Sequence, residues 1–277
     1  MPKLTAIQLC SEPDVDANLA LIEQQLAALT IAEQHLVVLP ECCLFFGGKD
    51  QQQLELARNV DAISLTKRLA NLAQTYQVFL VAGTIPLLAN CGDKFCNASC
   101  VFSPNGELMA RYDKIHLFDV HVQDKEGCYL ESKYTQAGDQ LVTTDLGFST
   151  LGLSVCYDIR FPELYRQLTQ RGATIITVPA AFTRPTGKAH WQALLQARAI
   201  ENQVYIIAAG QEGVHQNGRE TWGHSMVISP WGEILAQMPN GTGSISAEYQ
   251  TEELASIRRR MPVFDHNKFK TELTPYE

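Results

Sequence analysis

The sequence lacks the features of a membrane protein or a nucleic-acid-binding protein. No apolar run approaches the roughly 18 residues needed to span a bilayer, and residues 1–10 lack the longer apolar core of a signal peptide. Basic residues are few, with 22 Lys and Arg against 30 Asp and Glu, and the net charge of -8 disfavours binding to nucleic acid or anionic membranes. We therefore expect a cytoplasmic protein whose partner is a small molecule.

Common metal-site and nucleotide-site motifs are also missing. The chain has eight cysteines in 277 residues, but a long chain without a signal peptide usually keeps them reduced, so we expect no structural disulfide. Cys91, Cys96 and Cys100 lie close together, yet they show no CxxC spacing and no histidine stands among them, which disfavours zinc. No phosphate-binding loop, dinucleotide fingerprint or Gly-x-Ser-x-Gly motif occurs.

Strand-like and helix-like segments alternate along the chain, which is typical of an α/β fold. In the first half, the predicted order is strand, helix, strand, helix, strand, at residues 4–9, 19–29, 36–39, 65–76 and 78–82. The second half repeats this order at residues 151–155, from 162, 174–178, 188–201 and 204–209. The chain therefore reads as two pseudo-repeated halves.

Short segments repeat almost residue for residue between the halves. Residues 77–82 correspond to 203–208, and residues 101–107 correspond to 227–233, at the same offset. In the second pair, proline followed two positions later by glycine is turn chemistry, so we expect a β-hairpin in each half. Two such halves bury their sheets by stacking them face to face, which predicts a four-layer α-β-β-α sandwich formed by one domain of residues 1–277.

Reactive side chains follow two of the predicted strands. Glu41 comes just after residues 36–40, and Cys156 comes just after residues 151–155. Lys114 lies in an amphipathic segment after the first hairpin. Singly, they fit a first-turn helix carboxylate, a buried inert thiol and a surface lysine. Together they supply a general base, a nucleophile and a cation for the oxyanion, which attack on an amide requires.

Three segments, residues 39–41, 112–118 and 155–164, resemble the signature sequences of the nitrilase, or carbon-nitrogen hydrolase, superfamily. The resemblance extends from the first strand to residues 261–264 and agrees with the duplicated sandwich. It implies that Glu41 is the base, that Lys114 orients groups and stabilises the oxyanion, and that Cys156 forms a thioester while ammonia or an amine leaves.

Further site residues are implied by the same resemblance. It places a second glutamate at Glu131 and a second oxyanion donor at the backbone N–H of Tyr157. It calls for no metal or organic cofactor, and it implies a homodimer or a higher homo-oligomer. A surface role in a loop is the alternative for Glu131, because solvated carboxylates are common.

The neighbouring residues narrow the substrate. Residues 179–191 resemble the branch that holds the omega-amidases and the deaminated glutathione amidases, and residues 211–215 and 222–227 look more like the latter. That resemblance implies hydrolysis of deaminated glutathione to 2-oxoglutarate and cysteinylglycine, a metabolite-repair reaction. The alternative within the branch is an omega-amidase, which acts on 2-oxoglutaramate.

Three residues are expected to bind the substrate. The resemblance places a carboxylate-binding cation at Arg160 and a hydroxyl partner at Thr186, with Phe182 beside them. An arginine suits a carboxylate through its two-pronged geometry. The alternative for Arg160 is an ion pair with Glu163 or Asp158.

Two other classes of protein stay open. One is an interaction module that keeps the sandwich fold and has lost activity, although the presence of Glu41, Lys114 and Cys156 argues against it. The other is an unrelated Cys-His hydrolase, in which a histidine at position 116, 190 or 224 serves as the base. A lone histidine beside apolar residues is more often a hydrogen-bonded core group.

Overall fold

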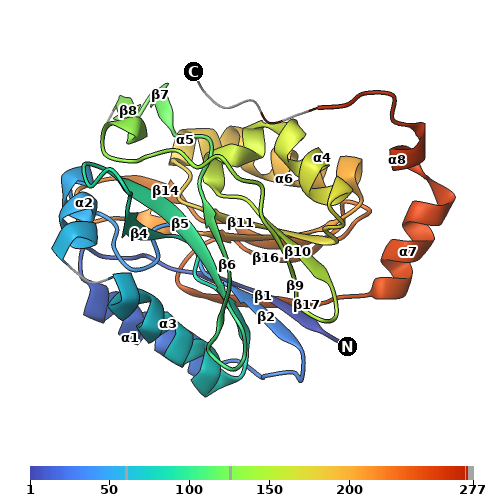
Figure 1. The fold of residues 1–277 in the computed structure, drawn as a ribbon, viewed down its shortest axis with the longest axis horizontal. Coiled ribbons are helices and arrows are strands. Elements are labelled where there is room, and N and C mark those ends of the chain that lie inside the picture. The colour runs from blue at the N-terminus through green and yellow to red at the C-terminus, as the bar shows by residue number, and fades with distance from the viewer. Residues whose placement is uncertain (60–61, 125–126, 272, 274–277) are drawn as a thin grey trace.

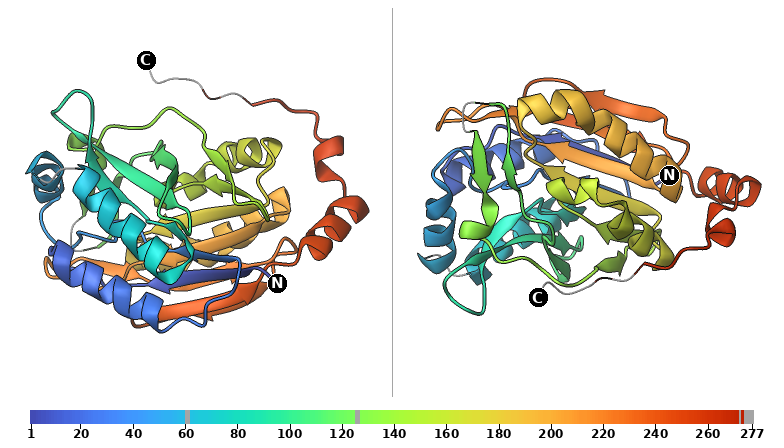
Figure 2. Two further views of the ribbon diagram at one scale, coloured as in Figure 1. Left: turned by 60° about the horizontal axis from the view of Figure 1, so that its bottom comes forward. Right: turned by 90° about the horizontal axis from the view of Figure 1, so that it is seen from above.

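The computed structural model of the protein describes residues 1–59, 62–124, 127–271 and 273. In this part of the chain, two large mixed sheets stack face to face, and helices cover their outer faces (Figure 1). Helices α1 and α3 lie on one side and α4 and α6 on the other, as the turned views also show (Figure 2). The predicted four-layer α-β-β-α sandwich is therefore confirmed.

The first sheet contains seven of the described strands. Its path runs β17, β1, β2, β3, β5, β4, with β6 paired to β5. Their bounds are β1 (Lys3–Gln8), β2 (His35–Val38), β3 (Phe79–Val81), β4 (Ile85–Leu88), β5 (Phe95–Phe102), β6 (Leu108–Asp113) and β17 (Gly243–Glu248). Strands β1, β2 and β3 are parallel, whereas β17 and β5 run antiparallel to their neighbours.

The second sheet has six strands among the described residues, in the order β16, β15, β12, β11, β10, β9. Their bounds are β9 (Thr143–Asp145), β10 (Thr150–Leu153), β11 (Ile175–Ala180), β12 (Tyr205–Gly210), β15 (Ser225–Ile228) and β16 (Ile234–Met238). Here β10, β11 and β12 are parallel. Two short antiparallel ribbons lie apart, β7 (Asp119–His121) with β8 (Cys128–Leu130) and β13 (Glu212–Val214) with β14 (Glu220–Trp222).

The covering helices bury one apolar face each. Helix α1 begins after Asp14, whose carboxylate accepts two backbone N–H groups of the first turn and so caps it. Its buried face carries Leu19, Ile22 and Leu26 at helical spacing, but Leu29, which the spacing placed on this face, follows the end of the helix. The helices are α1 (Val15–Ala27), α2 (Asp50–Asn59), α3 (Ala62–Tyr76), α4 (Pro162–Gln170), α5 (Arg184–Thr186), α6 (Gln192–Asn202), α7 (Thr251–Arg260) and α8 (Val263–His266).

The predicted hairpins both form, and they are built alike. In β5–β6 the hydroxyl of Ser103 accepts two backbone N–H groups of the turn, and Ser229 does the same in β15–β16. Gly106 and Gly232 hold φ near +79° and +88°, which glycine adopts without strain. Each hairpin also shifts register just before its turn. The sequence repeat therefore corresponds to a structural repeat.

Two parts of the fold differ from the predicted segments. The helix expected at residues 188–201 is interrupted, because a π-helical turn (Gly187–Trp191) connects α5 to α6. In addition, β17 lies beside β1 in the first sheet, so the last of the described strands joins the sheet of the first half. None of the described helices is long and apolar enough to cross a membrane.

Candidate active site

Glu41 lies just beyond the carboxyl end of β2, where α/β proteins commonly place functional loops. Gly83, which follows β3, approaches the carbonyl of Pro40 so closely that a Cβ would collide with it, and its φ is +42°. The backbone carbonyl of Glu41 accepts a hydrogen bond from the side chain of Gln211 at 3.0 Å. Its carboxylate is 5% exposed and accepts the backbone N–H of Ala181 at 3.0 Å. Strands of both sheets thus fix the carboxylate.

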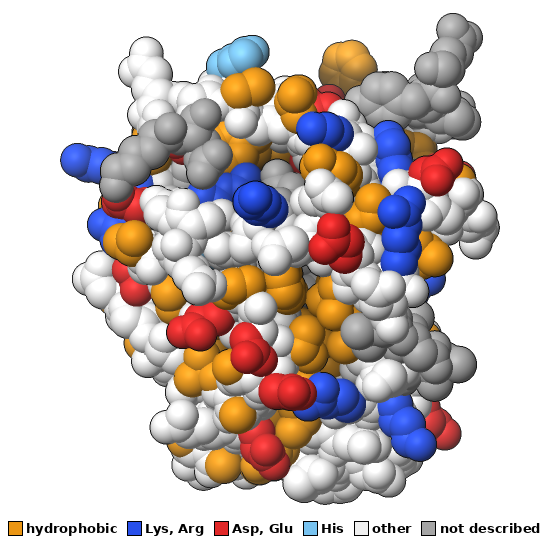
Figure 3. Space-filling model, turned by 90° about the vertical axis from the view of Figure 1, so that its left-hand side faces the viewer, with side chains coloured by type: hydrophobic (Ala, Val, Ile, Leu, Met, Phe, Trp, Pro, Cys, Tyr) orange, Lys and Arg blue, Asp and Glu red, His pale blue; other side chains and the backbone are white. Residues whose placement is uncertain are grey.

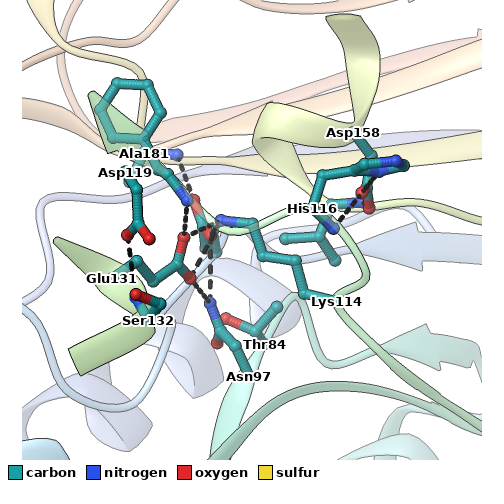
Figure 4. A network of polar contacts seen from close by, with 12 residues as sticks. Thr84, Asn97, Lys114, His116, Asp119, Glu131, Ser132, Asp158 and Ala181 are labelled. Atoms are coloured by element: carbon teal, nitrogen blue, oxygen red, sulfur yellow. Dashed lines mark hydrogen bonds and ion pairs between the residues drawn. The ribbon is translucent and has the colours of Figure 1, made fainter. Parts of the chain in front are cut away.

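Lys114 follows β6 and is 2% exposed. Its ammonium nitrogen lies 2.8 Å from Oε1 of Glu41 and 2.8 Å from Oε2 of Glu131. Hydrogen bonds also hold the backbone of Lys114, because its N–H donates to the carbonyl of Asn97 and its carbonyl accepts the N–H of Gly138. Figure 4 shows the side chain of Lys114 extended toward Glu131 and Asn97.

Glu131 opens a short 3-10 helix, η1 (Glu131–Lys133), directly after β8. Its Oε2 accepts the backbone N–H of Phe118 at 2.7 Å in addition to the ammonium of Lys114. The side-chain nitrogen of Asn97 donates to Oε1 of Glu131 at 3.3 Å and to Oε1 of Glu41 at 3.1 Å. The two carboxylates are therefore bridged twice, once by a cation and once by an amide.

Cys156 begins the 3-10 helix η2 (Cys156–Arg160), which follows β10. It is buried, and its φ is 49°, a left-handed conformation that costs a non-glycine residue energy and is often found at functional sites. The fully buried Asp158 holds the turn: its carboxylate accepts the backbone N–H of Val155 and the hydroxyl of Tyr112, both within 2.8 Å. This link joins the segment of the thiol to the strand that leads to Lys114.

The ionisation of these groups follows from burial and from their neighbours. Burial and the carboxylate of Glu41 raise the pKa of the Cys156 thiol well above its ordinary value, although Lys114 opposes them. Burial alone would lower the pKa of Lys114, but Glu131 and Glu41 hold it well above the ordinary range. Burial also raises the pKa of Glu131 against the effect of Lys114. The resting site thus holds a neutral thiol beside a charged ammonium.

These groups line one cavity. Glu41, Lys114, Glu131 and Cys156 all contribute to its wall, and aromatic side chains supply much of the rest. Strands β8 and β14 and helix α5, which contribute to this wall, lie on the left-hand side of the molecule in Figure 1. On the face seen in Figure 3, hydrophobic side chains and Lys or Arg side chains lie next to one another in the upper half.

The predicted substrate-binding residues do not all line the cavity. Phe182, Thr186 and Tyr157 line the cavity. Arg160 does not: its guanidinium lies 5.8 Å from the ring centre of Tyr157 and 5.6 Å from that of Phe182, with a 3.3 Å contact to His190. Among the described residues it forms no ion pair with Glu163 or Asp158, so the alternative weighed for it is not seen.

The histidines proposed for a Cys-His hydrolase are engaged elsewhere. His116 hydrogen-bonds to Asp158 at 2.7 Å and stacks on Phe161, and His224 stacks on Trp222. His190 is exposed. None of the three is part of the described cavity wall. In the described part of the chain, no cluster of three potential metal ligands occurs.

Several residues of the cavity wall were not predicted from the sequence, among them the polar residue Asn97 and the cation Arg219. Asn97, which bridges the carboxylates, belongs to no sequence motif. The only sign of its role is that it is a polar residue inside the buried strand β5. Arg219 lies between β13 and β14, and its guanidinium lies over the rings of Tyr129 and Phe46. An isolated arginine in a loop belongs to no sequence motif, so one sequence alone does not indicate its role.

Comparison with known proteins agrees with this geometry. The carbon-nitrogen hydrolase family matches residues 3–259. A deaminated glutathione amidase of Yersinia enterocolitica is 43% identical over 270 residues, which cover 97% of this chain and 94% of that protein. The chain belongs to the carbon-nitrogen hydrolase family.

Other members of the carbon-nitrogen hydrolase family are also similar. The omega-amidase NIT2 of Homo sapiens is 38% identical over 230 residues, covering 83% of this chain and 81% of that protein. The crystal structure of Saccharomyces cerevisiae Nit3, a member of branch 10 of the nitrilase superfamily, has a TM-score of 0.84 at 32% identity and covers 96% of both chains. The predicted family and the predicted class, a hydrolase of carbon–nitrogen bonds outside peptides, are therefore confirmed.

Proposed function

We propose that this chain is a cysteine-dependent amidase that hydrolyses deaminated glutathione to 2-oxoglutarate and cysteinylglycine. The observation that carries the proposal is the meeting of Glu41, Lys114, Glu131 and Cys156 in one cavity. The substrate is supported by the relative of Yersinia enterocolitica, which is named for it.

The first half of the reaction breaks the amide bond. Glu41 takes the proton of the neutral Cys156 thiol as the sulfur attacks the amide carbon, so a carbon–sulfur bond forms. The same carboxyl then gives that proton to the amide nitrogen, and the carbon–nitrogen bond breaks. Cysteinylglycine leaves as the amine, and the 2-oxoglutaryl group stays on the sulfur as a thioester.

The negative charge on the amide oxygen needs fixed donors. Lys114 is suited to this role because two carboxylates hold its ammonium in position before the substrate arrives, so little reorganisation is needed during the reaction. The backbone N–H of Tyr157 is the second donor in this proposal. Glu131 serves to position Lys114, together with the amide of Asn97.

The second half hydrolyses the thioester. Glu41 accepts a proton from a water molecule as the water oxygen bonds to the thioester carbon. The carbon–sulfur bond then breaks, the sulfur regains its proton and 2-oxoglutarate is released. Arg160 and Thr186, with Phe182 beside them, are the residues that we propose for the oxo-acid end of the substrate.

We also propose a cytoplasmic homodimer. The support is the family resemblance, together with a sequence that carries a net negative charge and no long apolar run. Light scattering on the purified protein tests the oligomeric state, since a monomer at micromolar concentration would contradict it. Fractionation of the source cells tests the compartment.

The function is tested with a panel of four substrates: deaminated glutathione, 2-oxoglutaramate, a ureido acid and an aliphatic nitrile. We expect the highest kcat/KM with deaminated glutathione and no turnover by Cys156→Ala. A clear preference for 2-oxoglutaramate would make the protein an omega-amidase, a reading that the similarity to human NIT2 favours. A wild type that cleaves no amide and shows no thiol reactivity above background would be an inactive interaction module.

A further inference from the structure

A row of aromatic rings runs along the cavity wall between two arginines. The ring centres of Tyr129 and Phe118 are 5.2 Å apart, and those of Phe118 and Tyr157 are 5.1 Å apart. The guanidinium of Arg219 lies 4.8 Å from the centre of Tyr129, at one end of the row, and that of Arg160 lies 5.8 Å from the centre of Tyr157, at the other. The two cations are thus separated by three contiguous rings.

The reacting groups and the three rings share one cavity wall. Cys156 directly precedes Tyr157 in the chain, and the carboxylate of Glu131 accepts the backbone N–H of Phe118. All of these residues line the cavity. Arg219 is part of this wall, whereas Arg160 lies behind the ring of Tyr157, so a substrate that lies on the rings of Phe118 and Tyr129 meets Arg219 directly.

On the basis of the proposed function, we infer that Arg219 binds a carboxylate on the leaving-group side of the scissile amide. The substrate class is then an amide with a carboxylate on each side of the bond that breaks, one for Arg160 on the acyl side and one for Arg219 on the amine side. Deaminated glutathione has this form, because its glycine carboxylate departs with the amine. 2-Oxoglutaramate has a carboxylate only on the acyl side.

The setting of Arg219 suits a carboxylate. Its guanidinium carbon lies near the rings of both Tyr129 and Phe46, at 4.8 and 5.7 Å. A guanidinium held over aromatic faces keeps its in-plane N–H groups for acceptors, and its five donors serve more than one partner at a time. The proposal therefore does not require Arg219 to lack other contacts in the resting protein.

The cavity wall carries charges of both signs. Lys114 is held between the carboxylates of Glu41 and Glu131, so its ammonium is already engaged. The carboxylate of Glu220, which also lines the cavity, lies 3.4 Å from the guanidinium of Arg184 and so has a cation beside it. Besides Lys114, Arg219 is the Lys or Arg residue that lines the described cavity, so it is the cation there that can meet a carboxylate of the substrate.

The test compares three substrates with the purified full-length protein: deaminated glutathione, the same molecule with its glycine carboxylate changed to a carboxamide, and 2-oxoglutaramate. Arg219→Gln should lower kcat/KM for deaminated glutathione by about tenfold to a hundredfold, as expected for a lost charge-assisted contact, and should change the other two by less than about threefold. Arg160→Gln should lower all three alike. The unchanged enzyme should itself lose about tenfold or more when the carboxylate becomes a carboxamide, a comparison that does not depend on how a variant folds.

Arg68→Gln is the matched control, because Arg68 is an exposed arginine of α3 paired with Asp16. It should leave all three values unchanged. Equal losses for all three substrates in Arg219→Gln, or no loss for any, would overturn the assignment of Arg219 and leave the proposed function standing. A wild type that hydrolyses none of the three would instead overturn the proposed function, and this inference with it.

Discussion

Replacing Asn97 with leucine should weaken the carboxylate pair while leaving Lys114 in place. The asparagine nitrogen donates to Glu41 at 3.1 Å and to Glu131 at 3.3 Å. Leucine has the same branching at Cγ and no donor. Because hydrogen bonds to an ionised carboxylate favour its charged form, their loss should make the pair take up a proton more easily.

The size of the effect follows from the two contacts. A hydrogen bond to a charged group contributes about 1.5 to 3 kcal/mol, and the longer of the two contributes less. Lys114 still touches both carboxylates, so we expect a net cost near 1.4 to 2.8 kcal/mol, or about tenfold to a hundredfold in kcat/KM. The unfolding free energy should fall by less than about 2 kcal/mol, because leucine also removes a buried amide oxygen that has no partner among the described residues.

The assay is the pH profile of kcat/KM for deaminated glutathione between about pH 5.5 and 9, together with the rate at which iodoacetamide alkylates Cys156. Burial already raises the pKa of Glu131, and loss of a donor to its carboxylate should raise that pKa further, so the acid limb should move to higher pH. Ser99→Ala is the control, since Ser99 lies two residues further along β5 and is also buried. A folded Asn97→Leu enzyme with an unchanged profile, or an acid limb moved to lower pH, would refute the bridging role.

Three further predictions concern the nucleophile, the cation and acid stability. Cys156→Ala should keep the fold and lose activity, and a stoichiometric alkylator should label this cysteine in peptide maps; inactivation with the label on another cysteine would contradict the assignment. Lys114→Arg should lose about a hundredfold or more in kcat, because a planar guanidinium cannot take the place of a compact ammonium between two carboxylates, and near-normal turnover would argue against an oxyanion role. Burial lowers the pKa of His35 and His215 to about 4, below their ordinary value, so the unfolded chain binds more protons as the pH falls through 6.5. Urea unfolding at pH 7.5 and 5.5 should show a loss on the order of 1 kcal/mol for each histidine, and equal stability at both pH values would show that the two are not held neutral.

The parts of the site that the sequence predicted are those fixed by local position. Glu41 and Cys156 follow apolar strands. A residue directly after a strand lies at the carboxyl end of that strand, and this position depends only on the local sequence. The two hairpins were predictable for a similar reason, because Pro and Gly at fixed offsets define a turn without help from distant residues.

What could not be predicted depends on packing between distant segments. Asn97 acts only because β5 brings it beside carboxylates from two other segments, and one polar residue in a strand does not reveal its partners. Arg160 was expected in the cavity, but packing places its guanidinium behind the rings of Tyr157 and Phe182. Arg219 reaches the cavity through the ribbon β13–β14, whose position relative to the sheets no local pattern encodes.

The pairing of β17 with β1 delays completion of the first sheet during synthesis. Residues 3–8 leave the ribosome well before their partners at residues 243–248. Until then one edge of β1 shows unpaired backbone groups, which are a template for pairing with another chain. Contacts between such distant segments also form slowly, because a long loop must close first. The nascent chain is therefore most exposed to aggregation during synthesis, and protection of this strand edge by a chaperone should matter more for its yield than the stability of the finished fold.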